Sequence, residues 1–261
     1  MVEKSNICNI NGQDKLIKNI TPVIISKNSE LHIEKCLKSL EIFQEVVVYD
    51  NGSTDKTLEI CKQFPNVKIF IGKFYGFGPT KNHAANLAKT DWVFSIDSDE
   101  VATDELIHEI KMVDLSDKTK VFKVNRKNLF LGTAIKHSGW NPDWIARIYN
   151  KKHTSFTTQK IHEKIVIHKN TKVESLKGRL IHYAVNDLND FLIKAAQYSS
   201  IKRENQKCHS STVILFRALF AFFRTFLLKK GFLDGHRGLI ISVGQFIGVF
   251  FKYMKQYEKC K

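Results

Sequence analysis

The sequence predicts an α/β fold, in which a mostly parallel sheet is followed by a helical C-terminal extension. Three observations support this prediction. Short apolar runs alternate with amphipathic helical patterns through the first hundred residues, acidic and small polar residues directly follow the apolar runs, and the pattern is helical from residue 187 onward. Alternating strands and helices favour a parallel sheet. With 43% hydrophobic residues among 261, the chain can bury one substantial core.

The N-terminal half alternates regularly between the two kinds of element. Strands are expected at the short apolar runs 22–26, 45–50, 67–71 and 92–96. Helices are expected between them, at 30–40, 53–64 and 79–89. Ser53 or Thr54 can cap the second of these helices, and Pro79 suits the first turn of the third.

The pattern changes in the C-terminal half. After a helix at 106–112, further strands are expected at 121–132, 144–152, 164–169 and 178–184. Three helices are expected to follow, at 188–207, 213–230 and 238–258. We therefore divide the chain into a polar N-terminal arm (1–20), an α/β domain (21–186) and a helical C-terminal region (187–261).

Charge and cysteine content narrow the class of protein. Forty-one Lys and Arg against 26 Asp and Glu give a formal net charge of +15, which favours a phosphate-bearing partner: nucleic acid, anionic lipid or a phosphorylated substrate. Five scattered cysteines without a C-x-x-C pair argue against a zinc site and predict reduced thiols in the cytoplasm. The N-terminus lacks the apolar segment of a secretory signal. The longest apolar stretch, 239–251, is shorter than the ~20 residues that span a bilayer, so no spanning segment is predicted.

Polar side chains follow three of the predicted strands, at the edge where parallel sheets bind ligands. The segment SKNSE contains Lys27 and Asn28, and the segment DNGSTD contains Asp50 and Asp55. Asp50 can accept a hydrogen bond from a uracil N–H, and Asp55 can fix the loop or reach a ribose. The alternative for DNGSTD is a plain turn followed by a helix cap.

The segment VFSIDSDE carries the strongest signal. Asp97 and Asp99 follow a buried strand with only Ser98 between them, and carboxylates this close repel each other unless a cation or protons neutralise them. Oxygen ligands in this arrangement suit Mg²⁺ or Mn²⁺ shared with substrate phosphates. A solvated turn before a helix is the alternative. The apolar strand and the neighbouring acidic loops favour the metal site.

The glycine-rich loop GKFYGFGPTKN precedes the helix expected at 79–89. A dinucleotide-binding glycine loop would follow the first strand, where this chain has SKNSE instead, so that reading is excluded. Lys81 and Asn82, on the first turn of the helix, can contact a donor phosphate or sugar. The alternative for Lys81 is a solvated lysine.

Four segments, in this order and spacing, resemble the family 2 glycosyltransferases of GT-A fold: VIISKNSELHIEKCLKSL, VVVYDNGSTDKTLEI, GFGPTKNHA and DWVFSIDSDE. The later segments GWNPDWIARIYN, KIHEKI, LKGRLIHY and LKKGFLDGHRGL resemble the subgroup that adds glucose to the inner-core heptose of lipopolysaccharide. The match runs from about Pro22 to Tyr257. It implies a GT-A, Rossmann-like nucleotide-sugar-binding catalytic domain at 21–186.

The resemblance also implies a reaction. It is the inverting transfer of a hexose, glucose from UDP-glucose, in β-linkage to a heptose of the lipopolysaccharide or lipooligosaccharide inner core, or to another cell-surface glycan. Asp50 would contact the uracil, and Asp97 and Asp99 would hold Mg²⁺ or Mn²⁺ against the UDP diphosphate. Such a cation stabilises the negative charge that grows on the departing diphosphate.

The catalytic base is assigned by the same resemblance. The family usually carries it in a Glu-Asp pair after an arginine-bearing strand. Here the strand contains Arg147, which joins the donor-binding candidates, and the pair is His162-Glu163. Glu163 therefore falls in the base position, and Asp143 is its rival.

Three aromatic side chains are further candidates. His182 can complete the metal or phosphate shell, although a histidine on an apolar strand is often a core residue. Trp140 and Trp144 can stack on sugar rings or pack in the core.

The C-terminal helices combine apolar and basic residues. Arg217 and Arg224 lie two turns apart among phenylalanines, and the segment from Val213 to Lys261 has nine Lys and Arg against two acidic residues. An apolar face bordered by cations is typical of an interfacial membrane helix. The alternative is packing on the catalytic domain. We expect peripheral contact with anionic lipid at the inner face of the bacterial inner membrane, where lipid-linked core oligosaccharide acceptors reside.

Two rival classes use the same features. A basic nucleic-acid-binding protein would explain the net charge, but the acidic residues at the predicted ligand edge repel a phosphate backbone, so no nucleic-acid partner is expected. A metal-dependent phosphohydrolase or sugar nucleotidyltransferase would use the same carboxylates. Release of UDP without transfer, or pyrophosphate chemistry, would distinguish these from a glycosyltransferase.

Overall fold

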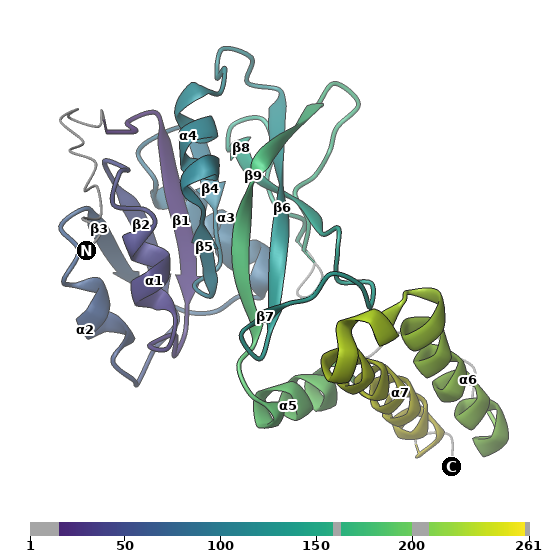
Figure 1. Cartoon of the computed structure of the whole chain (residues 1–261). Helices are drawn as coiled ribbons and strands as arrows, with labels where there is room; N and C mark the ends of the chain where they lie inside the picture. The colour runs from purple at the N-terminus through teal and green to yellow at the C-terminus, as the bar shows by residue number, and fades with distance from the viewer. Residues whose placement is uncertain (1–15, 159–162, 200–208, 259–261) are drawn as a thin grey trace, which may run out of the picture.

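The computed structural model describes residues 16–158, 163–199 and 209–258, which form one mixed nine-stranded sheet, helices on both of its faces and a helical group beside it (Figure 1). The strands are β1 (Ile20–Ser26), β2 (Val46–Asp50), β3 (Val67–Ile71), β4 (Trp92–Ser95), β5 (Glu100–Ala102), β6 (Lys120–Phe130), β7 (Thr133–Ala134), β8 (Trp144–Asn150) and β9 (Lys172–Val185). The helices of the domain are α1 (Ile33–Lys38), α2 (Thr57–Cys61), α3 (Phe77–Leu87) and α4 (Asp104–Met112). The α/β class is confirmed.

The N-terminal half of the sheet is parallel, as predicted. Its strand order is β3-β2-β1-β4, with Ser26 beside Asp50 and Val23 beside Ser95. Because parallel strands end at one edge, the loops after β1, β2 and β4 all emerge there. This edge carries the polar segments that the sequence singled out.

The C-terminal half of the sheet is mixed. β8 pairs antiparallel with β4 and with β6, whereas β6 and β9 are parallel and β5 is antiparallel to β9. The strand predicted at 164–169 is wrong, because there only Ile165 forms an isolated bridge, with Phe156. β9 begins at Lys172 rather than 178. Its first residues are polar and mostly exposed, so their pairing with β6 left no apolar signal.

Two element boundaries and the N-terminal arm differ from prediction. The helices predicted at 30–40 and 53–64 are shorter, because their first residues bond the loops of the ligand edge. The arm was expected to extend to residue 20, but Ile17 is buried and bridges Phe43, and β1 already begins at Ile20. Residues 1–15 lie outside the described residues.

A separate hydrophobic cluster lies on each face of the parallel strands, because successive side chains of a strand point to opposite faces. Val46 and Val48 of β2 pack in the cluster that also contains residues of α1, α2 and α4. Val47 and Tyr49 pack in the cluster that contains residues of α3. With both faces covered, only the strand ends and their loops are open to a ligand.

The C-terminal region forms a helical group beside the ends of β6 and β9 (Figure 1). It consists of α5 (Leu188–Ser199), α6 (Ser211–Phe223), the π-helical turn η1 (Arg224–Leu228), the 3₁₀ turn η2 (Gly231–Asp234) and α7 (Gly235–Tyr257). The three predicted helices are confirmed, with the first ending at Ser199 among the described residues. A side chain at Gly244 of α7 would collide with the Phe191 ring of α5, so this glycine permits the close packing of the two helices.

One helix is long and apolar enough to cross a membrane, by length and composition alone. It runs from Ser211 to Leu228 and is mostly unburied. The prediction of no spanning segment rests on the stretch 239–251, whereas the helix predicted at 213–230, which contains Arg217 and Arg224, is interpreted as interfacial.

Candidate active site

The loops after β1 and β2 are bonded to each other. Asn28, at a left-handed φ of 51°, accepts the Thr54 N–H at 2.8 Å and donates its own N–H to Ser53 Oγ at 2.8 Å. The Asp55 carboxylate accepts the Glu30 N–H at 3.1 Å. Asn28 and Asp55, both predicted to bind the donor, are thus engaged in holding the edge of the site.

Asp50 is fully buried. Its carboxylate accepts the N–H groups of Gly52 and Ser53 at 2.9 and 2.8 Å, and the Ser53 hydroxyl at 2.5 Å. Gly52 has a φ of 86°, where a side chain is strained. Asp50 thus stabilises the turn, and its contact with a uracil stays a prediction. The segment forms the predicted turn, but the predicted helix cap is wrong: the N-cap residue of α2 is Lys56, and no side chain caps this helix.

A cluster of buried charges lies after β4. The two carboxylate oxygens of Asp97 contact Lys81 Nζ at 2.9 Å and Arg147 Nη2 at 2.6 Å. Lys81 also contacts Glu163 Oε1 at 3.0 Å, and Arg147 contacts Glu100 Oε1 at 2.5 Å. Lys81 is 6% exposed and Arg147 5%, so the solvated-lysine alternative is wrong. Side chains from α3, β5, β8 and the loop of Glu163 thus form one cluster with Asp97.

The charges of this cluster stabilise one another. Burial raises the pKa of Asp97, but Arg147 and Lys81 outweigh burial and hold that pKa well below its usual value. Burial likewise lowers the pKa of Arg147, and Asp97 and Glu100 raise it further than burial lowers it. Asp97 is therefore an ionised carboxylate already neutralised by protein cations. Lys81 and Arg147 thus offset its repulsion from Asp99, and a metal contact of Asp97 stays a prediction.

Asn82 has a structural role in this arrangement. Its side-chain amide donates to the Phe156 carbonyl at 2.9 Å and accepts the Phe156 N–H at 2.8 Å. The Phe156 ring in turn lies 5.2 Å from Lys81 Nζ. Asn82 was predicted to touch the donor, but both ends of its amide hold the segment that packs against Lys81.

A chain of hydrogen bonds orients His182. The Asn128 amide nitrogen donates to Trp140 O and Asp143 Oδ2, both at 3.0 Å. Its oxygen therefore faces His182 Nδ1, 2.6 Å away, and that nitrogen carries the proton. In the neutral ring, Nε2 then keeps a lone pair, 3.6 Å from Asp99 Oδ2.

Asp99 and His182 fit a divalent cation shared with a substrate. One carboxylate and one imidazole, whose tautomer is set by a neighbour, are ligands for such an ion. Their side chains are 36% and 19% exposed. In the described part of the chain, no three or more His, Cys, Asp or Glu are grouped to hold a metal. Diphosphate oxygens and water would complete the coordination.

The first of two adjoining cavities lies at the carboxyl ends of β1 and β4. It has a volume of about 660 Å³ and we call it the donor-side cavity. Residues from both halves of the sheet line it, among them Lys27, Ser29, Asn51, Lys81, Asp97 and Glu163. Lys27 is an exposed residue of the SKNSE segment. Charged groups of both signs therefore face this cavity.

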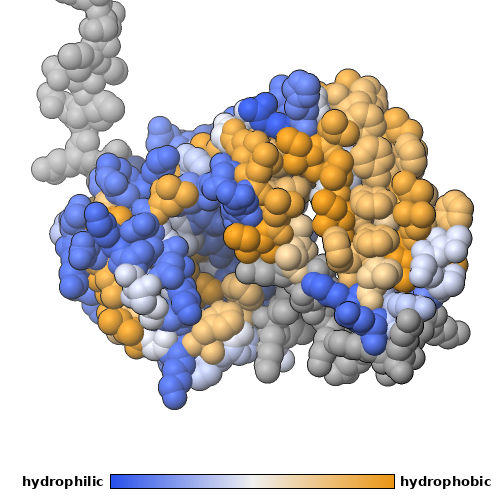
Figure 2. All heavy atoms as spheres, turned by 90° about the horizontal axis from the view of Figure 1, so that it is seen from below, coloured by the Kyte–Doolittle hydropathy of each residue, from blue (hydrophilic) through white to orange (hydrophobic). Residues whose placement is uncertain are grey.

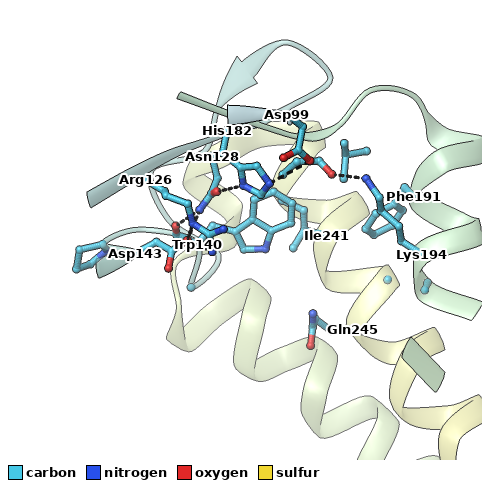
Figure 3. A pocket seen from close by; sticks show the side chains of 16 residues that line it. Asp99, Arg126, Asn128, Trp140, Asp143, His182, Phe191, Lys194, Ile241 and Gln245 are labelled. Atoms are coloured by element: carbon cyan, nitrogen blue, oxygen red, sulfur yellow. Dashed lines mark hydrogen bonds and ion pairs between the residues drawn. The ribbon is translucent and has the colours of Figure 1, made fainter. Parts of the chain in front are cut away.

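The second cavity, of about 480 Å³, lies between the sheet and the C-terminal helices (Figure 3). We call it the helix-side cavity. Trp140 and Asp143 line it from the loop before β8, and Phe191, Lys194 and Ile241 line it from α5 and α7. Asp99, Arg126 and His182 line both cavities.

The two tryptophans have different environments. Trp140 is half-buried, contacts the Phe130 ring edge-to-face at 5.8 Å and lines the helix-side cavity. Trp144 is 45% exposed and lines neither cavity. Of the two tryptophans, Trp140 alone borders one of these cavities, and its stacking on a sugar stays a prediction.

Sequence reasoning missed three residues of the site. Glu100 is fully buried and contacts Arg126 Nη1 at 3.3 Å in addition to Arg147. Arg126 holds Asp143 through Nε and Nη2, both at 2.8 Å. Arg126 and Asn128 are two residues apart on β6, so they share one face of the strand. Two large polar residues at this spacing were the available signal.

Comparison with known proteins identifies the family of the chain. The model of glycosyl transferase family 2 matches residues 21–178, more than half of the chain. The chain belongs to glycosyltransferase family 2. The matched region contains Lys81, Asp97, Asp99, Arg147 and Glu163, whereas His182 and the C-terminal helices lie beyond it.

Relatives of this family 2 glycosyltransferase extend past the matched region. An uncharacterized glycosyltransferase of Rickettsia typhi is 28% identical over 87% of this chain and 82% of its own length. The lipopolysaccharide core biosynthesis glycosyltransferase LpsC of Rhizobium meliloti is 24% identical over 92% of each chain. Among solved structures, S. aureus TarS in complex with UDP is 16% identical over 93% of this chain and 92% of that one, with a TM-score of 0.48.

Proposed function

We propose that this enzyme transfers a hexose, glucose from UDP-glucose, with inversion onto a heptose of the lipopolysaccharide inner core. The meeting of the donor-side and helix-side cavities at Asp99, Arg126 and His182 is the observation that carries this proposal. A transferase needs donor and acceptor to meet at one point. The sequence resemblance to the heptose glucosyltransferase subgroup and the name of the Rhizobium meliloti relative support the acceptor.

The donor-side cavity suits a nucleoside diphosphate sugar. Lys27 and Lys81 supply positive charge, and Asn51 lies at the end of β2 where a base can approach. Asp99 and His182 would hold Mg²⁺ or Mn²⁺ on the diphosphate, and that cation would stabilise the negative charge of the leaving group.

The helix-side cavity suits the acceptor. Trp140 offers a ring for stacking on a sugar, and Lys194 and Arg126 offer donors for hydroxyl or phosphate groups.

Glu163, held by Lys81, is the proposed base that removes the proton of the acceptor hydroxyl as it attacks. Asp143 Oδ2 accepts hydrogen bonds from Arg126 Nε and Asn128 Nδ2 and forms an ion pair with Arg126 Nη2. A carboxylate held in this way is better suited to position the acceptor. Direct displacement inverts the anomeric centre and turns an α-linked donor into a β-linked product.

A donor screen tests the proposed reaction. The full-length protein is incubated with UDP-, GDP- or dTDP-sugars and heptose-containing core oligosaccharide, and the products are read by mass spectrometry. One added hexose from UDP-glucose alone is the expected result. Transfer only to a glycan that lacks heptose would instead place the enzyme on another cell-surface acceptor, and pyrophosphate formation from UTP and a sugar phosphate would indicate a nucleotidyltransferase.

Asp99→Ala tests the cation. We expect the variant to bind UDP with Mn²⁺ only as weakly as the parent protein binds it in a chelator, because the carboxylate that faces His182 is lost. Calorimetric titration with and without Mn²⁺ measures this. The control is Asp104→Ala, at an exposed residue that begins α4. Unchanged metal-dependent affinity in Asp99→Ala would remove Asp99 from the proposed ligands.

A further inference from the structure

Helix α6 presents an apolar face that no described part of the chain covers. It buries Ile214, Ala218 and Ala221, which are spaced four and three residues apart and so lie on one stripe that faces α7. The opposite face continues through η1 and η2. We define the interfacial face as Phe216, Phe220, Phe223, Leu227, Phe232 and Leu233, all exposed.

The interfacial face is large for a protein surface. Phe216 is 68% exposed and Phe220 63%, and exposed aromatic side chains that adjoin one another mark an interaction site. Figure 2 shows hydrophobic side chains gathered on the right of the molecule, where Figure 1 places α6 and α7, whereas the left side is mainly hydrophilic. On this face of the molecule, the apolar side chains gather mainly on the helical group.

Basic side chains border the interfacial face. A hollow of about 460 Å³ between α6 and α7 is lined by Arg217, Arg224 and Lys252, together with Phe216 and Phe220 of the face. Arg217 donates to the Tyr253 hydroxyl at 3.0 Å. Among the described residues, none of the three cations is paired with a carboxylate. Unneutralised cations beside apolar side chains are complementary to the phosphates and acyl chains of an anionic lipid surface.

We propose that the interfacial face inserts into one leaflet of an anionic bilayer, with Arg217, Arg224 and Lys252 at the level of the lipid phosphates. A second copy of this chain fits less well, because a two-fold contact would bring the same arginines of both copies together. Spanning also fits less well. A spanning helix would place the charges of Arg217 and Arg224 in the hydrocarbon core, which is costly, and at Lys230, with a φ of 55°, the chain turns back toward α7.

The interfacial face is connected directly to the helix-side cavity. Phe232 and Leu233 are followed by Asp234, whose carboxylate accepts the N–H groups of Lys136 and His137 at 3.1 Å and the Ser138 hydroxyl at 2.7 Å. The same loop continues to Trp140 and Asp143. Contact with a leaflet would therefore hold this cavity at a fixed height above the lipid. If the acceptor is lipid-linked, which rests on the proposed function, this fixed height places the sugar of the acceptor, and not its lipid, at the reaction site.

Vesicle binding tests the proposal without any sugar nucleotide or acceptor. Co-sedimentation of the full-length protein is measured on phosphatidylcholine vesicles with and without phosphatidylglycerol. We expect Phe216→Ser/Phe220→Ser to lower partitioning onto phosphatidylglycerol vesicles at least about tenfold, because the variant lacks two aromatic rings that the leaflet would bury. Arg217→Gln/Arg224→Gln should lower it about fivefold per arginine, and only when phosphatidylglycerol is present.

Matched variants control for general surface effects. Ile71→Ser/Met112→Ser removes two exposed apolar side chains of the α/β domain, and Lys62→Gln/Lys68→Gln removes two exposed cations there. Both should bind vesicles like the parent protein. All variants should transfer hexose to a delipidated core oligosaccharide at the parent rate, which separates failure of this surface from failure of the proposed function.

Three results would overturn the proposal. The first is parent-like vesicle binding by Phe216→Ser/Phe220→Ser. The second is resistance of the membrane-bound protein to alkaline carbonate extraction, which would indicate a spanning helix. The third is a parent protein that sediments as a dimer and does not bind vesicles, together with a Phe216→Ser/Phe220→Ser variant that sediments as a monomer. This would assign the interfacial face to contact with a second copy.

Discussion

Glu163→Gln should lower kcat about 10²–10⁴-fold while the affinity for the UDP-sugar changes little, because general-base catalysis contributes on that order. Glutamine keeps the shape of the side chain and an oxygen that can accept from Lys81, 3.0 Å away in the parent protein. It cannot accept the proton of the acceptor hydroxyl. Steady-state transfer assays together with calorimetric titration of the donor separate the two effects.

The rival base supplies the matched control. Asp143→Asn removes a carboxylate from the helix-side cavity, where Arg126 and Asn128 hold it. We expect this variant mainly to raise KM for the acceptor, since Asp143 is proposed to position it. An active Glu163→Gln beside an Asp143→Asn that binds donor but does not transfer would exchange the two roles.

Arg147→Met should lower the free energy of unfolding by about 3–5 kcal/mol at pH 7, because it leaves two carboxylates without their shared cation. Arg147 contacts Asp97 at 2.6 Å and Glu100 at 2.5 Å, and Glu100 is fully buried. Chemical denaturation followed by circular dichroism measures the loss. Arg179→Met, at an exposed position of β9, is the control and should change stability by less than about 0.5 kcal/mol.

The loss of unfolding free energy in Arg147→Met should depend on pH. Burial raises the pKa of Asp97, but Arg147 and Lys81 lower it well below its usual value. A carboxyl with a depressed folded-state pKa contributes stability above its unfolded pKa, about 3.9, and this contribution is lost as the pH falls through the folded pKa. The deficit of Arg147→Met should therefore be largest near neutrality and narrow below about pH 4. A deficit that is constant over this range would contradict the assignment.

Local sequence patterns were sufficient for the parallel half of the sheet. Short apolar runs between helical patterns located β1 to β4, and the polar residues after them located the ligand edge, with Asp97 and Asp99 at its centre. The same reasoning could not find the pairing of β6 with β9. That pairing joins segments more than forty residues apart, and the first part of β9 is polar and exposed.

Some roles of individual site residues are likewise visible in the local sequence, whereas others depend on the tertiary structure. A propensity for turns and caps belongs to a short segment, so the turn alternative for DNGSTD was visible from the sequence. Whether Asp50 faces a ligand or its own backbone depends on burial, and the structure buries it completely. The same holds for Lys81, which is a solvated lysine by composition and a buried partner of Asp97 and Glu163 by position.

The sequence by itself determined the α/β class, the edge at which the chemistry takes place and the apolar, basic character of the C-terminal helices. All three depend on side chains close together along the chain, where strand and helix periods dictate which face each residue occupies. Only the tertiary structure decided that Lys81 and Arg147 neutralise Asp97, that Asn128 orients His182, and that Asp234 ties the helices to the loop of Trp140. These contacts join residues tens of positions apart, and a carboxylate acquires its partner, its burial and its pKa only when distant segments pack around it.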